Sequence, residues 1–176
     1  VLRHHVDVGR RRRAGGSEWL RYMRGATDWR GTLTMRNKRV DFAVDSTLQG
    51  LAINLPAPFA KSATETMPLR IERRHTGAQQ ERVAVNVGSL VSAVFHRRSE
   101  AGSTRIERGV ARFGEGVAAE PDRPGLVLSG AIKSLDLDGW LAVLGESTPG
   151  GGATTVTAAD LRIGELEWFD RKFAAL

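Results

Sequence analysis

Apolar and polar residues alternate along much of this chain with a period of two, which is the pattern of β-strands that have one dry face and one wet face. From Trp29 to Met35 the odd-numbered positions are mainly apolar, and the even-numbered positions are arginine or threonine. The same alternation runs from Val40 to Val44, and the polar residues 37–39 between the two runs suit a hairpin turn. These two runs are therefore predicted to pair as antiparallel neighbours.

Further short strands follow, separated by turn-prone groups such as 120–125 and 149–152, which are rich in Gly and Pro. Eight or more strands in succession predict a mainly β fold built on an antiparallel, meandering, curved sheet. The pattern leaves open whether that sheet is an open groove or is sandwich-like. The remaining predicted strands are 69–72, 82–87, 90–95, 104–113, 126–132, 154–163 and 165–169.

Two short helices are predicted beside the sheet. Ser17 suits the N-cap of a helix that ends at Gly25, with an acidic residue near its start and Arg24 near its end. Asp136 or Asp138 suits the N-cap of a second helix over 139–144, which Gly145 terminates.

The chain has the length of one domain, and its charge is distributed unevenly along it. The 176 residues suit one domain, and the formal net charge is +6. Residues 1–24 hold seven arginines against two acidic residues, so most of the excess charge lies there. We therefore predict a basic connector over 1–16 and a β-rich segment over 17–176. No aromatic stacking platform accompanies the arginines, so a solvated connector is favoured over a nucleic-acid arm and no nucleic-acid partner is expected.

Other broad features restrict the chemistry and the context of the protein. The sequence has no cysteine, which excludes disulfides and thiolate metal sites. No apolar run approaches the roughly 20 residues that span a bilayer. The chain opens on Val1 and closes on apolar residues, so we expect it to be a section of a longer protein.

The sequence offers little support for a catalytic or metal-binding site. The histidines at 75 and 96 have arginines as neighbours, which suits neither a metal ligand nor a general base. The acid pairs Asp136 with Asp138 and Glu165 with Glu167 most simply solvate a surface, because nothing in the sequence marks one acid for a raised pKa.

Nucleophile and phosphate motifs give no better candidate. Gly-Xaa-Ser-Xaa-Gly is absent, and the glycine groups at 114–116 and 150–152 lack the Gly-Lys-Ser/Thr ending of a phosphate loop. We therefore predict a protein that is not an enzyme, with no catalytic residue, no metal and no cofactor.

Several stretches resemble the AsmA-like superfamily, and specifically the YhdP-type envelope proteins related to TamB. The stretch 20–33 is similar to that family's short helix, glycine and "Trp-any-Gly-any-Leu" strand opening. The most specific stretch is 46–61, in which Leu55-Pro56-Ala57-Pro58 and then Lys61 resemble the family's "Leu-Pro-any-Pro, then Lys". The segments 108–114, 124–130, 135–141 and 159–169 resemble its later strand and Trp-helix units in the same order.

The resemblance implies a periplasmic portion of a long protein anchored in the inner membrane of a Gram-negative cell. Such proteins are similar to bridge-like lipid carriers, in which an apolar groove moves phospholipid between the inner and outer membranes. The alternating strands supply one apolar face for such a groove, and acyl chains bind by area burial without a specific polar partner. The candidate lipid-facing residues are Leu33, Met35, Val40, Phe42, Val44, Leu69, Ile71, Val83, Val85 and Val87.

Other interpretations stay open on the sequence alone. The same apolar residues would equally suit the closed core of a sandwich. A structural or protein-interaction module of the cell envelope, with an edge strand that recruits further envelope proteins, is the alternative function. An enzyme acting on envelope polysaccharide would rest only on the scattered carboxylates.

Overall fold

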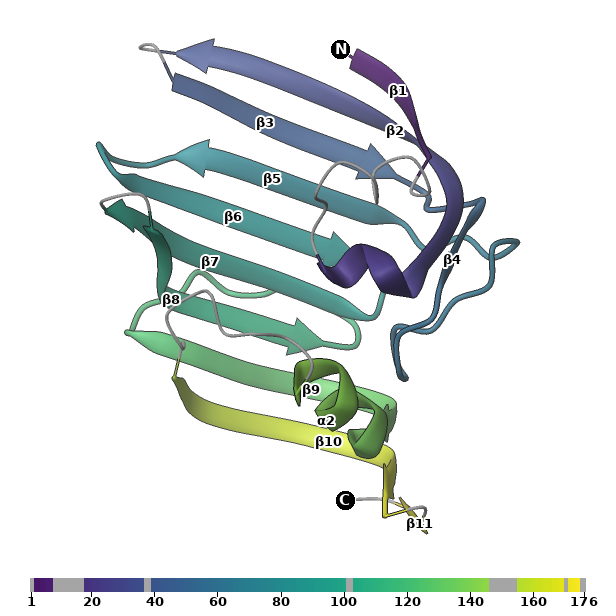
Figure 1. Cartoon of the computed structure of the whole chain (residues 1–176). Helices are drawn as coiled ribbons and strands as arrows, with labels where there is room; N and C mark the ends of the chain where they lie inside the picture. The colour runs from purple at the N-terminus through teal and green to yellow at the C-terminus, as the bar shows by residue number, and fades with distance from the viewer. Residues whose placement is uncertain are drawn as a thin grey trace.

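The fold is a single open, mixed β-sheet in a computed structural model that describes residues 2–7, 18–36, 39–100, 103–145, 155–169 and 171–174. Ten strands follow one another in the order β1-β2-β3-β5-β6-β7-β8-β9-β10-β11, and β4 pairs with β2 outside this path (Figure 1). The strands are β1 (Leu2–Asp7), β2 (Met23–Arg36), β3 (Arg39–Ser46), β4 (Leu51–Ile53), β5 (Leu69–His75), β6 (Gln80–Val87), β7 (Val91–Glu100), β8 (Ser103–Phe113), β9 (Gly125–Asp136), β10 (Val156–Trp168) and β11 (Arg171–Ala174). The predicted mainly β class is confirmed, and the sheet is open rather than a sandwich.

The antiparallel part of the sheet runs from β1 to β8. β2 and β3 form the predicted hairpin, with Leu33 opposite Phe42 and Met35 opposite Val40. Two residues of its turn, Asn37 and Lys38, lie outside the described residues. Because β3, β5, β6 and β7 continue in the same alternating register, each strand presents its apolar positions on the same side as its neighbour.

Two pairs are parallel, which the predicted antiparallel meander did not include. β9 pairs in parallel with β8 and also with β10. Parallel neighbours need a crossover. Residues 114–124 make the first crossover without forming a helix, and α2 (Leu137–Gly145) lies in the second. The first crossover resembles a turn-rich loop in the sequence, so the pattern of residues gave no sign of it.

Of the two predicted helices, α2 is confirmed and the first is wrong in type and length. Residues Glu18–Tyr22 form a 3-10 helix, η2, and Met23 already belongs to β2. The chain leaves the helix early because Met23 to Gly25 pair with β4. Gly25 has a φ of 103°, and an added Cβ there would lie 2.3 Å from the Gly50 carbonyl oxygen, so this close approach requires glycine.

The two ends of the strands differ in how they are covered. The capped end is where β5 begins at Leu69, and the turn end is where β5 finishes at His75. At the capped end, Leu48, Leu51 and Ile53 form a buried cluster that also contacts Leu20 of η2 and Leu69. The capped end therefore holds one of the hydrophobic clusters of the described structure.

The sheet begins earlier than expected. β1 pairs with β2 from Leu2 opposite Gly31 to Asp7 opposite Ala26, inside the stretch 1–16 assigned to a connector. Residues 8–16 lie outside the described residues. The division of the chain at residue 16 stays a prediction.

Candidate functional site

One face of the sheet carries a continuous row of apolar positions that crosses the strands from β2 to β10. Residues directly opposite each other in neighbouring strands point to the same face, so the strand register defines the row. We call it the floor row, and its members in strand order are Gly31, Val44, Ile71, Val85, Ala93, Ala111, Leu128 and Ala159.

The rows on either side of the floor row are also largely apolar, and together the three form the apolar face. Toward the capped end lie Trp29, Ser46, Leu69, Val87, Val91, Phe113, Gly130 and Leu161. Toward the turn end lie Leu33, Phe42, Arg73, Val83, Phe95, Gly109 and Leu126.

All ten residues predicted from the sequence to face lipid lie on this one side of the sheet. Eight belong to the three rows, and the pair Met35 and Val40 follows one step closer to the turn end. The structure therefore brings the ten together. Whether they contact lipid stays a prediction.

The larger apolar side chains of this face are not fully covered, although the small Ala93 and Ala111 of the floor row are buried. Leu33 and Met35 are 58% and 75% exposed, and Val44, Ile71 and Val85 are half-buried. Among the described residues no side chain is fully buried. The cluster at the capped end reaches this face at Leu69, and the second cluster lies on the opposite face.

The floor row is long enough for an extended hydrocarbon chain. Eight strands make seven inter-strand steps of about 4.8 Å, so the row is about 34 Å long. One leaflet of a bilayer contributes roughly 15 Å of hydrocarbon, half of the ~30 Å core. An acyl chain laid across the strands would fit within the row.

The opposite face is polar and carries ion pairs between neighbouring strands. Arg70 contacts Asp45 and Glu72, both at 2.7 Å, and Arg74 contacts Glu72 at 2.9 Å. These partners hold the pKa of Glu72 below its usual value, with the hydrogen bond from Arg70 as the largest cause. The carboxylate therefore stays ionised at neutral pH, and this face behaves as a hydrated surface.

Residues 114–124, the first crossover, lie across the polar face and form the second buried cluster there. Ala118 packs on Ala84 and Val94, and its amide donates to the Ser92 hydroxyl at 2.9 Å. Glu120 accepts hydrogen bonds from Arg82 at 3.1 Å and lies 2.6 Å from Nε2 of His96. The polar face thus holds packing that the pattern of alternation assigned to the apolar one.

The apolar face ends at an ion-pair cluster near the turn end. The buried carboxylate of Glu81 accepts hydrogen bonds from Arg73 and Arg97. Burial alone would raise the pKa of Glu81, but the two arginines outweigh this effect and hold the pKa below its usual range. The guanidinium carbon of Arg73 also lies 5.9 Å from the centre of the Phe42 ring, within reach of a cation–π contact.

The segment that most resembles the family motif builds the capped end. Lys61 is only 6% exposed, and its ammonium donates to the carbonyl oxygens of Leu51 at 2.7 Å and Ser62 at 2.8 Å. Burial lowers the pKa of Lys61, and the nearby charge of Glu65 partly opposes this. The indole nitrogen of Trp140 in α2 donates to the Ala57 carbonyl at 2.8 Å. The motif therefore fixes the loop over the strand ends.

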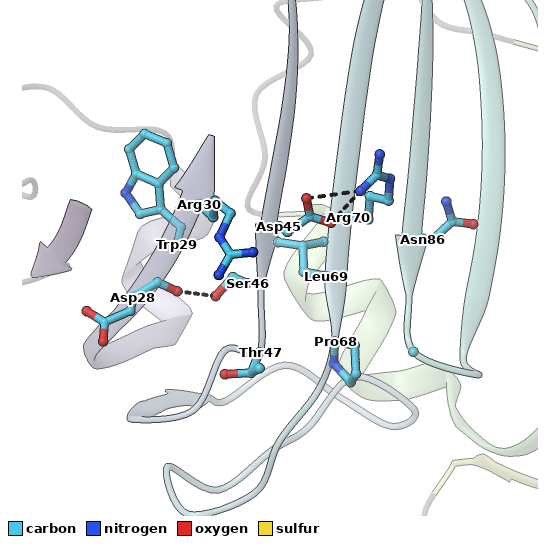
Figure 2. Close-up of a pocket in the computed structure, with 11 residues that line it drawn as sticks. Asp28, Trp29, Arg30, Asp45, Ser46, Thr47, Pro68, Leu69, Arg70 and Asn86 are labelled. Atoms are coloured by element: carbon cyan, nitrogen blue, oxygen red, sulfur yellow. Dashed lines mark hydrogen bonds and ion pairs between the residues drawn. The ribbon is translucent and has the colours of Figure 1, made fainter. Parts of the chain in front are cut away.

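Two hollows flank the capped end. One of about 860 Å³ lies where β2, β3, β5 and β6 meet this end, and residues of both faces line it, including Trp29 and Arg30 (Figure 2). Figure 2 also shows the ion pair between Arg70 and Asp45 at its wall. The other, of about 1,120 Å³, lies between Pro58 and the strands β9 and β10. Both fall in or near the size range of ligand pockets.

The catalytic candidates of the sequence do not converge. Asp136 accepts a hydrogen bond from the Gly139 amide at 2.7 Å and so caps α2, and Glu165 pairs with Lys172 at 3.0 Å. Within the described ranges, no group of three His, Asp or Glu is arranged to hold a metal ion. His75 lies 3.2 Å from Asp41, and His96 contacts Glu120, so each histidine has an acidic partner besides the arginines that adjoin it in the sequence.

Comparison with known protein families gives a match that covers nearly the whole chain. The family model described as "YhdP protein" matches residues 2–176. The chain belongs to the YhdP family. No curated protein and no solved structure matches it.

For a YhdP-family chain, membership suggests lipid transport related to the cell envelope and a generally non-enzymatic role, both at the level of the family. In the described part of the chain, no helix is long and apolar enough to cross a membrane.

The sequence pattern did not reveal two parts of the candidate site in this YhdP-family chain. The floor row continues through Ala93 and Ala111, whose small side chains do not stand out as lipid-facing. The cluster of Arg73, Glu81 and Arg97 was also missed. The signal was present, because Arg73 has the same parity as Leu69 and Ile71, so it had to share their face.

Proposed function

We propose that this chain is a section of a lipid-carrying trough in a periplasm-spanning envelope protein. The apolar face shelters the acyl chains of phospholipid that moves between the inner and outer membranes. The parent protein is anchored in the inner membrane.

One observation carries this proposal. The floor row is apolar across eight strands of an open sheet, while the two buried clusters lie at the capped end and on the polar face. A sheet that used this face as its core would bury the large side chains of the row, but Val44, Ile71 and Val85 are only half-buried, and the buried members are the small Ala93 and Ala111. A face of this kind suits a mobile apolar ligand.

The energetics suit carriage rather than tight recognition. Burial contributes about 0.8 kcal/mol for each methylene, so ten sheltered methylenes contribute about 8 kcal/mol before the loss of ligand freedom is subtracted. Because area burial has no direction, a chain can slide along the floor row without breaking a directional bond.

Photocrosslinking in the full-length protein in cells tests the proposal. A photoreactive amino acid replaces Leu33 or, in the control, Thr34, because these adjacent exposed residues point to opposite faces of β2. We expect phospholipid adducts at position 33 and few or none at position 34. Equal lipid capture at both positions, or none at position 33, would contradict the proposal.

The protein-interaction alternative has one observation in its favour. β1 and β11 stand at the two ends of the strand order, and each pairs with one neighbour among the described strands. An edge strand offers backbone groups for strand addition by a partner. Crosslinking from the exposed residue Arg171 that captures a protein, with no lipid at position 33, would favour this function.

A further inference from the structure

The ion-pair cluster of Arg73, Glu81 and Arg97 at the turn end has more hydrogen-bond donors than Glu81 can accept. Nε of Arg73 and Nη2 of Arg97 donate hydrogen bonds to different carboxylate oxygens of Glu81. A guanidinium has five N–H donors in a planar fork, so most donors of both arginines remain available. Their side chains are 36% and 34% exposed, whereas that of Glu81 is 6% exposed. The carboxylate thus holds two accessible guanidinium groups close together.

Arg97 also has a donor that no described residue satisfies. Its Nε is buried and has no hydrogen-bond partner in the described part of the chain. A buried donor without an acceptor is unfavourable. Glu81 therefore does not satisfy the Arg97 guanidinium by itself, and an oxygen-rich anion would meet the exposed donors of the same group.

The charge of the cluster calls for one further anion. Two guanidinium groups and one carboxylate sum to +1, and the low pKa of Glu81 keeps this carboxylate ionised at neutral pH. A phosphodiester carries a single negative charge and accepts paired hydrogen bonds from arginine forks. Its binding would bring the cluster to neutrality.

The position of the cluster relates it to the floor row. Glu81 and Val85 lie on the same face of β6 and four residues apart, which is about 13 Å along an extended strand. This separation is close to the roughly 15 Å depth of hydrocarbon in one leaflet. A phospholipid with its phosphate at the cluster and its tails directed along the strands would reach the floor row with the ends of its tails.

We propose that Arg73 and Arg97, held together by Glu81, form a binding site for the phosphate of a phospholipid headgroup. This proposal rests on the proposed lipid-carrying function and adds to it a fixed binding site for the headgroup. Lipid would then move stepwise, because each headgroup pauses at this rim while its tails cross the apolar face.

Binding measurements on the full chain can separate the headgroup site from the acyl-chain surface. Three probes are compared by native mass spectrometry and titration: dimyristoyl phosphatidylglycerol, dimyristoylglycerol without phosphate, and inorganic phosphate. The test variant is Arg73→Gln/Glu81→Gln/Arg97→Gln, in which Glu81 is also neutralised so that no unpaired carboxylate stays buried. The control is Arg74→Gln on the polar face, which changes the net charge by the same one unit.

We expect the triple variant to bind phosphatidylglycerol roughly tenfold more weakly or worse, down to the affinity for dimyristoylglycerol. Dimyristoylglycerol binding stays unchanged in the triple variant, and Arg74→Gln binds both lipids as the wild type does. Circular dichroism checks that each variant folds. The more conservative Arg73→Lys/Arg97→Lys, which keeps the charge and loses the fork, is expected to show an intermediate loss.

Other outcomes overturn one proposal or the other. If the wild type binds both lipids equally, the headgroup site is wrong while the acyl-chain surface stands. If inorganic phosphate binds as tightly as the phospholipid, the cluster is a site for free anions and not for lipid. If neither lipid binds, the proposed function itself fails.

Discussion

Shortening one valine on each face of the sheet distinguishes an open apolar face from a sealed core. Val85 in β6 and Val94 in β7 are close neighbours, since Val85 lies opposite Ala93 and Ala84 lies opposite Val94. Val85 belongs to the floor row and is half-buried, whereas Val94 is 3% exposed on the polar face against Ala84 and Ala118. The same substitution to alanine therefore probes opposite faces in the same region of the sheet.

The expected costs in unfolding free energy follow from this burial. Val94→Ala removes two buried methyl groups, worth about 1.6 kcal/mol, and leaves a cavity, for a total of about 2–3 kcal/mol. Val85→Ala removes partly exposed methyl groups and leaves no closed cavity, so its cost is below about 1 kcal/mol. The lower strand propensity of alanine affects both variants alike and cancels in the difference of about 1–2 kcal/mol.

Urea unfolding followed by circular dichroism measures both costs, with the slope of the transition checked for change. Equal losses in the two variants would refute the reasoning, because they would mean that the floor row is sealed as tightly as the cluster beneath the first crossover. A larger loss for Val85→Ala would identify the apolar face as the true core of the protein.

Three further predictions concern the parts that hold the sheet in place. Lys61→Met should lower the unfolding free energy by about 1–3 kcal/mol, because two backbone carbonyls lose their donor. Lys61→Ala should lower the unfolding free energy further, because it also leaves a cavity. Urea unfolding measures both changes. For Glu120, burial raises the pKa, but His96 and Arg82 outweigh it and hold the pKa below its usual value. Because this folded-state pKa is depressed, the stabilisation is present above the unfolded-state pKa and is lost as the pH falls through the folded value. The protection factor of the Ala118 amide, which is its intrinsic exchange rate divided by the observed rate, should therefore fall on acidification in the wild type, and Glu120→Gln should remove this fall. Trp140→Phe should cost about 1 kcal/mol through the lost indole hydrogen bond, and urea unfolding should show no loss if that bond is unimportant.

The sequence could predict which residues share a face wherever strands are antiparallel and connected by short turns. From β2 to β6 the alternation alone placed Leu33, Phe42, Val44, Ile71 and Val85 on one side, because side chains in a strand have a strict period of two. The register then follows from keeping the apolar positions together. This part of the fold and of the candidate surface was therefore open to prediction.

The rest depended on contacts between residues that are distant in the sequence. Residues 114–124 resemble a simple loop, and only the structure shows that Ala118 and Glu120 lie on the polar face and make β9 parallel to β8. Glu81 and Arg97 are 16 residues apart, and their ion pair appears only once β6 and β7 are in register. A pattern along one strand cannot specify such partners.

The arrangement of buried residues gives the two faces different physical roles. Most soluble sheets obtain stability by covering their apolar face, but here the described clusters lie beneath residues 114–124 and at the capped end. The ladder of backbone hydrogen bonds and the ion pairs of Arg70, Arg74 and Arg82 then stabilise the sheet from the polar side. Stability of this kind does not depend on filling the apolar face, so the proposed lipid ligand could enter and leave it without unfolding the protein. Substitutions on the polar face should therefore act mainly on unfolding free energy, and substitutions in the floor row mainly on lipid binding.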